Sequence, residues 1–452
     1  MNSYWHESVA GSKIDRDSLN KNIDVDIAIV GAGFSGLWTA YYLKQLQPDA
    51  RIAILEANQV GFGASGRNGG WCSGFLPMTL SEIAKQSGRQ AAVDIYRESF
   101  ATLDEIERVI HHEQIDCDYH RGGTIQGATN SVQCKRITDE VKTMHDYGFD
   151  ESDSRLLSSA ETRTRISIPD LMAAAYTPHC AAIHPAKLVT ALAKVVENNN
   201  VKIYERSHVN EINSRQIKLK DAIVRAEVVV RATEGFTSRI KHHRRTLAPL
   251  YSYMVATEPL TKSQREQIGW QNRETYHDAR NMIIYVQITK DGRIAFGGRG
   301  APYHFASRVK PEYDMHHRIH QQIIASMYEI FPITKNLKIT HRWGGPLGVP
   351  RNWRPSVNFD PRSGLASLGG YVGDGVAATN LAARTLAHLI SGDDHRLTKL
   401  AWVNHPSRKW EVEPMRYFGI NGLLKLSSSM DRHEQATGEV DKLRSKILDI
   451  FI

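Results

Sequence analysis

The chain has 452 residues, of which 41% are hydrophobic and 23% are charged. This composition excludes an intrinsically disordered chain and a fibrous repeat, and the length allows one to three domains. The formal net charge of +8 is not concentrated in a sustained basic run, so we expect no nucleic-acid partner.

Targeting signals and the spacing of the cysteines indicate the cellular compartment. No run approaches the roughly 20 consecutive apolar residues that a membrane span needs, and the first residues lack a secretory pattern. The cysteines are far apart in the sequence and form no C-x-x-C pair: Cys72, Cys117, Cys134 and Cys180. We therefore expect a cytoplasmic protein with no membrane span, disulfide framework or metal site.

The N-terminal part contains a complete βαβ pattern. Residues 25–30, with the sequence VDIAIV, predict a short buried parallel strand. Three glycines with the spacing G-x-G-x-x-G follow it: Gly31, Gly33 and Gly36. A helical segment comes next, and then a second apolar run over residues 51–55 that ends at Glu56. This order of elements predicts a dinucleotide-binding unit.

Each part of this unit has a chemical reason. Gly31 permits a tight turn, Gly33 lets backbone N–H groups approach a pyrophosphate, and Gly36 allows the helix to pack closely on the strand. Glu56 is expected to accept hydrogen bonds from ribose hydroxyls and to repel a 2′-phosphate, which disfavours NADP. The motif alone does not separate FAD from NAD. Its N-terminal position without a second copy favours a tightly held flavin.

A second glycine-rich segment, GFGASGRNGG, occupies residues 61–70. Five glycines among these ten residues cost conformational entropy, so the segment indicates a close approach of backbone to a ligand. Ser65 can donate a hydrogen bond to a phosphate, and Arg67 and Asn68 add a charge and an amide. The alternative interpretation is a flexible surface loop.

The middle of the chain alternates between helical and extended patterns. Residues 81–165 are predicted to be mostly helical, because apolar residues recur at spacings of three and four. Pro185 is predicted to open a helix that reaches about Asn198. Strand-like runs follow at residues 201–204 and 216–232.

The spacing of apolar residues changes again in the last part of the chain. From Pro249 onward, short apolar runs separated by turn residues predict a mostly antiparallel sheet. A glycine-rich turn at residues 369–375 then leads into a helix that Gly392 is expected to close. From about residue 395 the tail is predicted to be helical and partly polar.

These motifs together resemble one family. The βαβ unit, the loop at 61–70 and the late block GGYVGDGVAATNLAARTLAHLI are similar to the FAD-dependent amine and amino-acid oxidases of the D-amino-acid oxidase superfamily. The likeness is closer to the gamma-glutamylputrescine oxidase-like branch. Further supporting blocks are Ser3–Trp5, Arg231–Phe236, Gly297–Phe305 and His341–Arg351.

The resemblance implies a fold class and a domain division. The expected class is α/β: a discontinuous Rossmann-like FAD-binding domain plus a substrate domain built on a mostly antiparallel sheet with helices. Residues 22–80, 175–245 and 360–395 would form the FAD-binding domain. Residues 81–174 and 246–359 would form the substrate-binding domain, and residues 396–452 a C-terminal helical tail.

The resemblance also implies which residues hold FAD, from the ADP half through the pyrophosphate to the isoalloxazine. These are Gly31, Gly33, Phe34, Ser35, Gly36, Glu56, Ala57, Gly63, Ala64, Ser65, Gly66, Arg67, Asn68, Gly69, Gly70, Val209, Ala232, Thr233, Gly373, Asp374, Gly375 and Val376. Several related oxidases attach the flavin covalently through a cysteine in the C-terminal half. No cysteine follows Cys180 here and residues 61–70 contain no histidine, so noncovalent FAD is expected.

The antiparallel sheet is where this superfamily builds its substrate cavity. On that basis we expect catalytic roles for Arg67, Tyr253 and His304, and substrate binding by Tyr251, Tyr285, Arg299 and Trp343. Aromatic rings could surround an amine, and Arg299 could pair with an anionic group. Ordinary packing is the alternative for each tyrosine, and a surface ion pair is the alternative for Arg299.

The leading hypothesis is an FAD enzyme that oxidises the C–N bond of a small primary or secondary amine, with O2 as the expected acceptor and H2O2 as its product. Two other hypotheses remain open. The same chemistry could act on an anionic amine such as an aminophosphonate, an amino acid or a sarcosine-like amine. A protein of another class, which binds flavin and modifies RNA or transfers electrons, would share the motifs. The oligomeric state is not predicted.

Overall fold

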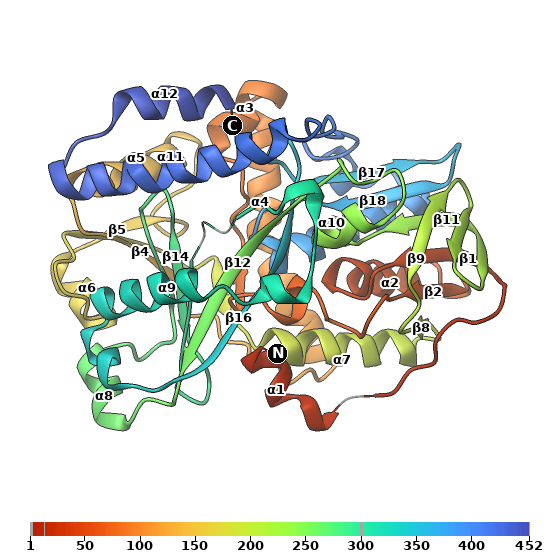
Figure 1. Ribbon diagram of the computed structural model, residues 1–452, viewed down its shortest axis with the longest axis horizontal. Coiled ribbons are helices and arrows are strands. Elements are labelled where there is room, and N and C mark those ends of the chain that lie inside the picture. Colours follow the sequence, from red (N-terminus) through yellow and green to blue (C-terminus); the bar gives the residue numbers. More distant parts are fainter. Residues whose placement is uncertain (1–2, 13, 299, 301, 452) are drawn as a thin grey trace.

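The computed structural model describes residues 3–12, 14–298, 300 and 302–451. Two large sheets form the framework, and Figure 1 shows them in opposite halves of the molecule. The long helix α4, Arg89–His112, lies between these halves. The arrangement is that of the expected α/β class.

The first sheet has the order β17-β18-β11-β1-β2-β8, and the β9–β10 hairpin is joined to it through β11. Its central strands are parallel, because β1 pairs in parallel with both β11 and β2. Its strands are β1 (Ile23–Val30), β2 (Ile52–Leu55), β8 (Lys202–Tyr204), β9 (Val209–Asn213), β10 (Gln216–Leu219), β11 (Ile223–Arg231), β17 (Ser356–Asp360) and β18 (Leu365–Gly369).

The two faces of β1 pack against different partners. Ile27 and Ile29 pack in a core with the helices, whereas Ala28 and Val30 pack in a core with the β9–β10 hairpin. A strand that is buried on both faces reads as a continuous apolar run, which is the pattern in the sequence. Because β1 runs parallel to both β2 and β11, the carboxyl ends of these three strands lie at the same edge of the sheet.

The second sheet has the order β16-β12-β15-β14-β13-β4-β6-β5 and is mostly antiparallel. Only its β13–β4 pair is parallel among the described pairs. Its strands are β4 (Thr124–Ala128), β5 (Arg155–Leu157), β6 (Ala173–Thr177), β12 (Ala248–Thr257), β13 (Thr275–Asp278), β14 (Ile284–Ile288), β15 (Ile294–Gly298) and β16 (Ile339–Val349). A small separate sheet pairs β3 (Trp71–Ser73) with β7 (Cys180–Ala182).

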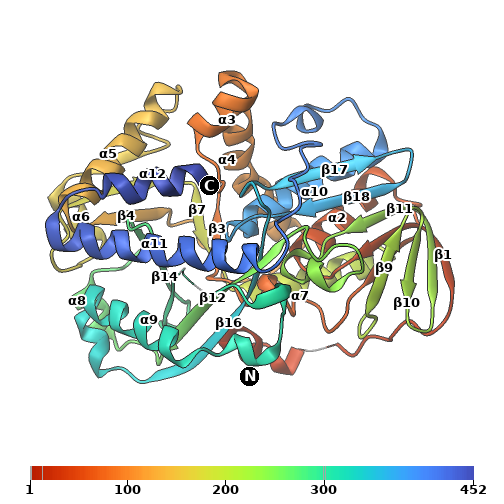
Figure 2. The same ribbon diagram turned by 45° about the horizontal axis from the view of Figure 1, so that its top comes forward.

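Helices cover both sheets, and Figure 2 shows α11 and α12 lying across the second-sheet half. Within the described ranges, none of them combines the length and apolar character needed to cross a membrane. Besides α4 they are α1 (Tyr4–Ser8), α2 (Phe34–Leu46), α3 (Leu80–Ser87), α5 (Ser131–Asp146), α6 (Ser159–Arg165), α7 (Pro185–Asn198), α8 (Lys262–Ile268), α9 (His317–Ile330), α10 (Gly375–Ser391), α11 (Met415–Thr437) and α12 (Lys442–Phe451).

The structure corrects the expected domain boundaries in three places. The helices α3 and α4 share the core of the first sheet, although 81–174 was assigned to the substrate domain. The strand β6 (Ala173–Thr177) joins the second sheet, although residues from 175 onward were expected in the FAD-binding domain. The strand β17 starts at Ser356 and joins the first sheet. Sequence patterns mark strands and helices, but they do not show which sheet an amphipathic face will cover.

The close approach of α2 to β1 depends on Gly36. A Cβ atom built there would lie 2.0 Å from the Gly31 carbonyl oxygen and 3.2 Å from Ile29 Cγ2. Alanine is the better helix former by about 1 kcal/mol, but a contact this short forces helix and strand apart. The steric cost therefore exceeds the gain in helix propensity.

We predict that Gly36→Ala lowers the thermal midpoint of unfolding, with a destabilisation of about 2 kcal/mol or more. The matched control is Gly419→Ala in α11, where a Cβ would meet nothing within 4 Å. The control should raise stability by about 0.5–1 kcal/mol. Equal shifts in the two variants would show that the contact between α2 and β1 is not limiting.

Candidate functional site

A first cavity lies at the carboxyl edge of the first sheet, where the loops after β1, β2 and β11 converge. This edge is where open parallel sheets bind ligands. Many residues expected to hold FAD line the cavity: Gly31, Gly33, Phe34, Ser35, Glu56, Ala57, Gly63, Ala64, Ser65, Asn68, Val209, Ala232, Thr233, Gly373, Gly375 and Val376.

Glu56 lies at the end of β2 and faces this cavity. Its two carboxylate oxygens accept hydrogen bonds of 2.9 Å from the backbone N–H groups of Ala32 and Asn58. Burial raises the pKa of the Glu56 carboxyl, and these two hydrogen bonds act in the opposite direction by favouring the carboxylate. The side chain is thereby held in place with acceptor capacity remaining for hydroxyl donors.

Two helix N-termini open onto the first cavity, which is the arrangement that an anionic cofactor requires. Gly33 caps α2 and Asp374 caps α10, and neither cap makes a side-chain hydrogen bond to its helix. The first turn of α2 also contains no acidic residue. The positive ends of both helix dipoles fit a pyrophosphate and the electron-rich edge of a flavin.

Three of the expected cofactor residues line neither cavity: Gly36, Gly66 and Gly70. A Cβ on Gly66 would lie 2.3 Å from Nε2 of His6, and a Cβ on Gly70 would lie 1.8 Å from Nε2 of Gln287. These glycines allow neighbouring protein segments to approach the backbone. The structure therefore gives them packing contacts rather than a place in the cavity wall.

The N-terminal segment holds the 61–70 loop from the side of the second sheet. The indole Nε1–H of Trp5 donates to the Asn68 carbonyl at 2.9 Å, and the Ser3 hydroxyl donates to the Gly66 carbonyl at 3.2 Å. Trp5 is 1% exposed, and it packs with Tyr4, Met254 and Trp343. We call residues 3–8 the N-terminal clasp, because they fix carbonyl groups that no strand or helix would otherwise pair.

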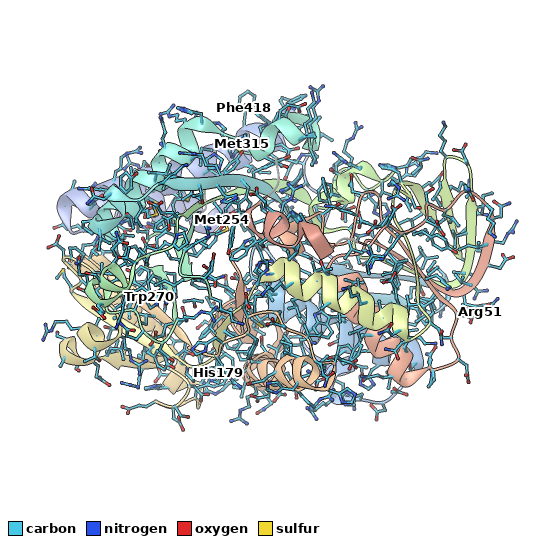
Figure 3. The ribbon with its side chains drawn as sticks, turned by 90° about the horizontal axis from the view of Figure 1, so that it is seen from below. Arg51, His179, Met254, Trp270, Met315 and Phe418 are labelled. Atoms are coloured by element: carbon cyan, nitrogen blue, oxygen red, sulfur yellow. The ribbon has the colours of Figure 1, made fainter. Side chains whose placement is uncertain are left out.

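A second cavity, of about 380 Å³, adjoins the first. Met254, labelled near the middle of Figure 3, is part of its wall. The two cavities share Ala64, Asn68, Leu347, Gly373 and Val376. A group bound in the first cavity would therefore border the second, which is the relation between a cofactor and a substrate site.

The structure brings only some of the expected substrate residues to this second cavity. Arg67 and Tyr285 line it, as do Gly69 and Asp374 from the expected cofactor set. Tyr251 and Tyr253 do not, because side chains alternate along β12: Ser252 and Met254 face the cavity, and the tyrosines pack in the core with α9.

Three further expectations have different outcomes. His304 lines neither cavity, and its ring stacks on Tyr313 with a centroid distance of 3.5 Å. Trp343 is 2% exposed and donates from Nε1 to the Arg67 carbonyl at 2.8 Å, so it supports the 61–70 loop from outside the cavity wall. Arg299 lies outside the described residues.

The guanidinium of Arg67 is paired within the protein. It forms an ion pair with Asp314, and its Nη1 also donates to the Gly344 carbonyl at 3.2 Å. Its Nε, also buried, has no hydrogen-bond partner among the described residues. Asp314 thus balances most of the positive charge of Arg67.

Sequence reasoning missed several residues that line these cavities. Glu234 lies within the block Arg231–Phe236 and lines the first cavity, but the sequence patterns predict no role for it. Its buried carboxylate accepts hydrogen bonds from the N–H groups of Gly370 at 2.9 Å and Tyr371 at 3.3 Å. Burial raises the pKa of Glu234 to about 7. It ties the end of β11 to the turn that carries Gly373.

The second cavity has a larger set of unassigned wall residues. The pattern could have pointed to the even-numbered positions of β12, because a strand that packs a helix on one face presents alternate residues to the other. The polar and aromatic members missed include Trp71, Gln126, Glu140, Tyr176, Ser252 and His277. Within the described residues, no group of three or more His, Cys, Asp or Glu side chains is arranged to hold a metal ion.

The fold and the paired cavities define a protein suited to bind a dinucleotide at the edge of a parallel sheet. The sequence model of the FAD-dependent oxidoreductase family, DAO, matches residues 26–389. The chain belongs to this family. Its first cavity is the place where the residues present fit FAD.

Two curated relatives cover most of the chain. The probable oxidoreductase OrdL of Haemophilus influenzae is 28% identical over 394 residues, covering 84% of this chain and 86% of the relative. The gamma-glutamylputrescine oxidoreductase of Escherichia coli is 27% identical over 415 residues, covering 89% and 92%.

Among solved structures, glycine oxidase from Geobacillus kaustophilus matches with a TM-score of 0.69 at 19% identity, covering 84% of this chain and 99% of that one. L-proline dehydrogenase from P. horikoshii matches with a TM-score of 0.66 at 17% identity, covering 85% and 96%. At these identities the structural likeness establishes the fold alone.

We predict that Glu56→Gln weakens the binding of FAD to the apoprotein by about tenfold, because a neutral amide is a weaker acceptor than a carboxylate for ribose hydroxyls. Fluorescence titration of the apoprotein with FAD measures the dissociation constant. Glu82→Gln is the control, since Glu82 also accepts a backbone N–H, from Thr79 at 2.7 Å, but lines neither cavity. Unchanged FAD affinity in Glu56→Gln would remove Glu56 from the cofactor site.

We predict that Trp5→Ala destabilises the protein by about 3–5 kcal/mol and weakens FAD binding, because the indole and its bond to Asn68 are both lost. Trp5→Phe keeps an aromatic ring and should cost less. The thermal midpoint and the FAD dissociation constant are the measurements. A loss of stability with unchanged FAD affinity would show that the N-terminal clasp does not position the 61–70 loop.

Proposed function

We propose that this protein is an FAD-dependent amine oxidase that acts on the C–N bond of a primary or secondary amine. The observation that carries the proposal is the second cavity, which borders the first through residues of both cofactor loops, Asn68 and Gly373. The name of the Escherichia coli relative, a gamma-glutamylputrescine oxidoreductase, supports an amine as substrate.

The charge of the cavity wall favours an amine over an anionic amine. Arg67 is the cationic side chain of the described wall, setting aside the titratable His277, and Asp314 is its ion-pair partner. A substrate carboxylate or phosphonate would have to compete with Asp314 for the guanidinium. An amine substrate meets no such competition.

The chain's part in the reaction is binding and orientation. FAD, when bound, would supply the hydride acceptor. Loss of a hydride from the carbon beside a neutral amine nitrogen would leave an iminium ion, which water hydrolyses to a carbonyl compound and ammonia or an amine with release of a proton. The walls formed by Trp71, Met254 and Tyr285 would hold the substrate carbon towards the shared boundary of the two cavities and limit access of water.

We further propose that FAD is held noncovalently and that O2 reoxidises it with formation of H2O2. None of the cysteines is among the residues that line either cavity. Burial raises the pKa of the thiols of Cys72, Cys117 and Cys180, which makes them poor nucleophiles. Acid precipitation should therefore release the flavin into the supernatant.

We predict that the purified protein is yellow and that a suitable amine bleaches its flavin absorbance under anaerobic conditions. The panel contains alkylamines, N-methylated amines, amino acids and aminophosphonates, and the rate of bleaching is the measurement. Bleaching by amines, followed by O2 consumption and H2O2 release in air, supports the proposal. Bleaching by amino acids or aminophosphonates alone would instead establish the anionic alternative.

A further inference from the structure

The second cavity reaches far from the cofactor edge. Its wall crosses the second sheet from β16 to β4, with Gly345, Met254, Tyr285, His277 and Gln126 on successive lining strands. Neighbouring strands lie about 4.8 Å apart, so this path is on the order of 20 Å along the curved sheet. Figures 1 and 2 both show α5 and β4 in the half of the molecule away from α2 and β18. A short amine would leave this far end empty.

The far end of the cavity carries a carboxylate. Glu140, on α5, faces Gln126 on β4, and Gln126 Nε2 donates to Glu140 Oε2 at 2.9 Å. Both side chains line the cavity, and Glu140 is exposed to it. Desolvation by the surrounding protein raises the pKa of the Glu140 carboxyl, while the bond from Gln126 and the charge of Arg136 act in the opposite direction.

The nearest cation on the same helix is directed elsewhere. Arg136, one turn before Glu140, forms an ion pair of 3.1 Å with Glu434 of α11 and donates to the Ala279 carbonyl. No described lysine, arginine or histidine nitrogen lies within ion-pair distance, 4.0 Å, of the Glu140 carboxylate. A carboxylate in a cavity wall with no cationic nitrogen within ion-pair distance is electrostatically suited to bind a cation.

The space between the two ends suits a hydrocarbon chain. Apolar and aromatic groups line it, including Trp71, Phe75, Leu76 and Met254, and Val141 and Met144 flank Glu140 on α5. Each methylene group removed from water against such a wall contributes about 0.8 kcal/mol. The wall is therefore polar at its two ends and largely apolar between them.

We propose that Glu140 binds the distal ammonium group of an elongated amine substrate, so that the enzyme selects amines with a second cationic group remote from the carbon that is oxidised. Diamines and longer polyamines have this chemistry. This inference rests on the proposed amine oxidase function for the reacting end of the substrate. It adds a specificity-determining residue at the other end.

The experiment uses the holoenzyme and a homologous series from diaminobutane to diaminodecane, each matched to the n-alkylamine of the same length. Anaerobic stopped-flow reduction of the flavin gives a dissociation constant for each amine. At the optimal length we expect the diamine to bind at least about tenfold more tightly than the alkylamine. In Glu140→Gln this ratio should fall by about tenfold.

Asp139→Asn is the matched control. It removes the same charge from the same helix, but Asp139 is exposed, pairs with Lys135 at 2.7 Å and does not line the cavity. The diamine-to-alkylamine ratio should be retained in this variant. A general effect of negative surface charge on cation binding would instead lower the ratio equally in both variants and would overturn the proposal.

A second readout separates this inference from the proposed function. Titration of the same amines into holoenzyme already reduced by dithionite measures binding by calorimetry without turnover. If amines bleach the flavin but the ratio is unchanged in Glu140→Gln, the inference fails and the amine oxidase function stands. If no amine bleaches the flavin but tight diamine binding depends on Glu140, the proposed function fails and the assignment of Glu140 as a cation site stands.

Discussion

The architecture depends on how the 61–70 loop satisfies its backbone. This segment contains no long strand or helix, so its carbonyl groups need partners from elsewhere. Side chains distant in the sequence supply them: Trp5 donates to Asn68, Trp343 donates to Arg67, and Gln287 donates to Gly69 at 2.7 Å. The loop that borders both cavities is therefore shaped by the second sheet and the N-terminus as much as by the first sheet.

This dependence explains why the cofactor and substrate sites are built together. A shift of β14 or β16 would alter the bonds to the loop, and the loop forms wall in both cavities. Glu234 makes a comparable connection on the opposite side, from β11 to the turn before α10. The loops expected to hold FAD are thus fixed by side chains that belong neither to those loops nor to the strands before them.

The sequence was most informative where the physics is short-range. The βαβ unit, the helix from Pro185 to Asn198 and the closure of α10 by Gly392 in a left-handed conformation were predicted from local patterns, and all are present. Local patterns did not predict which face of β12 lines the cavity. Tyr251 and Tyr253 are aromatic residues on the right strand, but a one-residue change of register exchanges cavity and core.

The position of Glu140 in a cavity wall was not predictable for a related reason. Glu140 lies in a polar helix where a carboxylate ordinarily faces solvent, and only the packing of α5 beside β4 and β6 places it in a cavity wall. Likewise, β4 itself was missed within a stretch predicted to be mostly helical. Packing between segments that are distant in the sequence decides which polar residues line a cavity, and local sequence patterns do not predict this packing.

The C-terminal helix α11 has an electrostatic consequence for a cavity that it does not line. Its buried Glu434 and its Asp431 hold Arg136 and the backbone N–H groups of Asn281 and Met282. By pairing with Arg136, Glu434 holds this guanidinium outside ion-pair distance of Glu140, so that only its longer-range charge acts on that carboxylate. A substitution at Glu434 in α11 would therefore alter the charge near Glu140, and with it the substrate preference, while every residue of the cavity wall stayed the same.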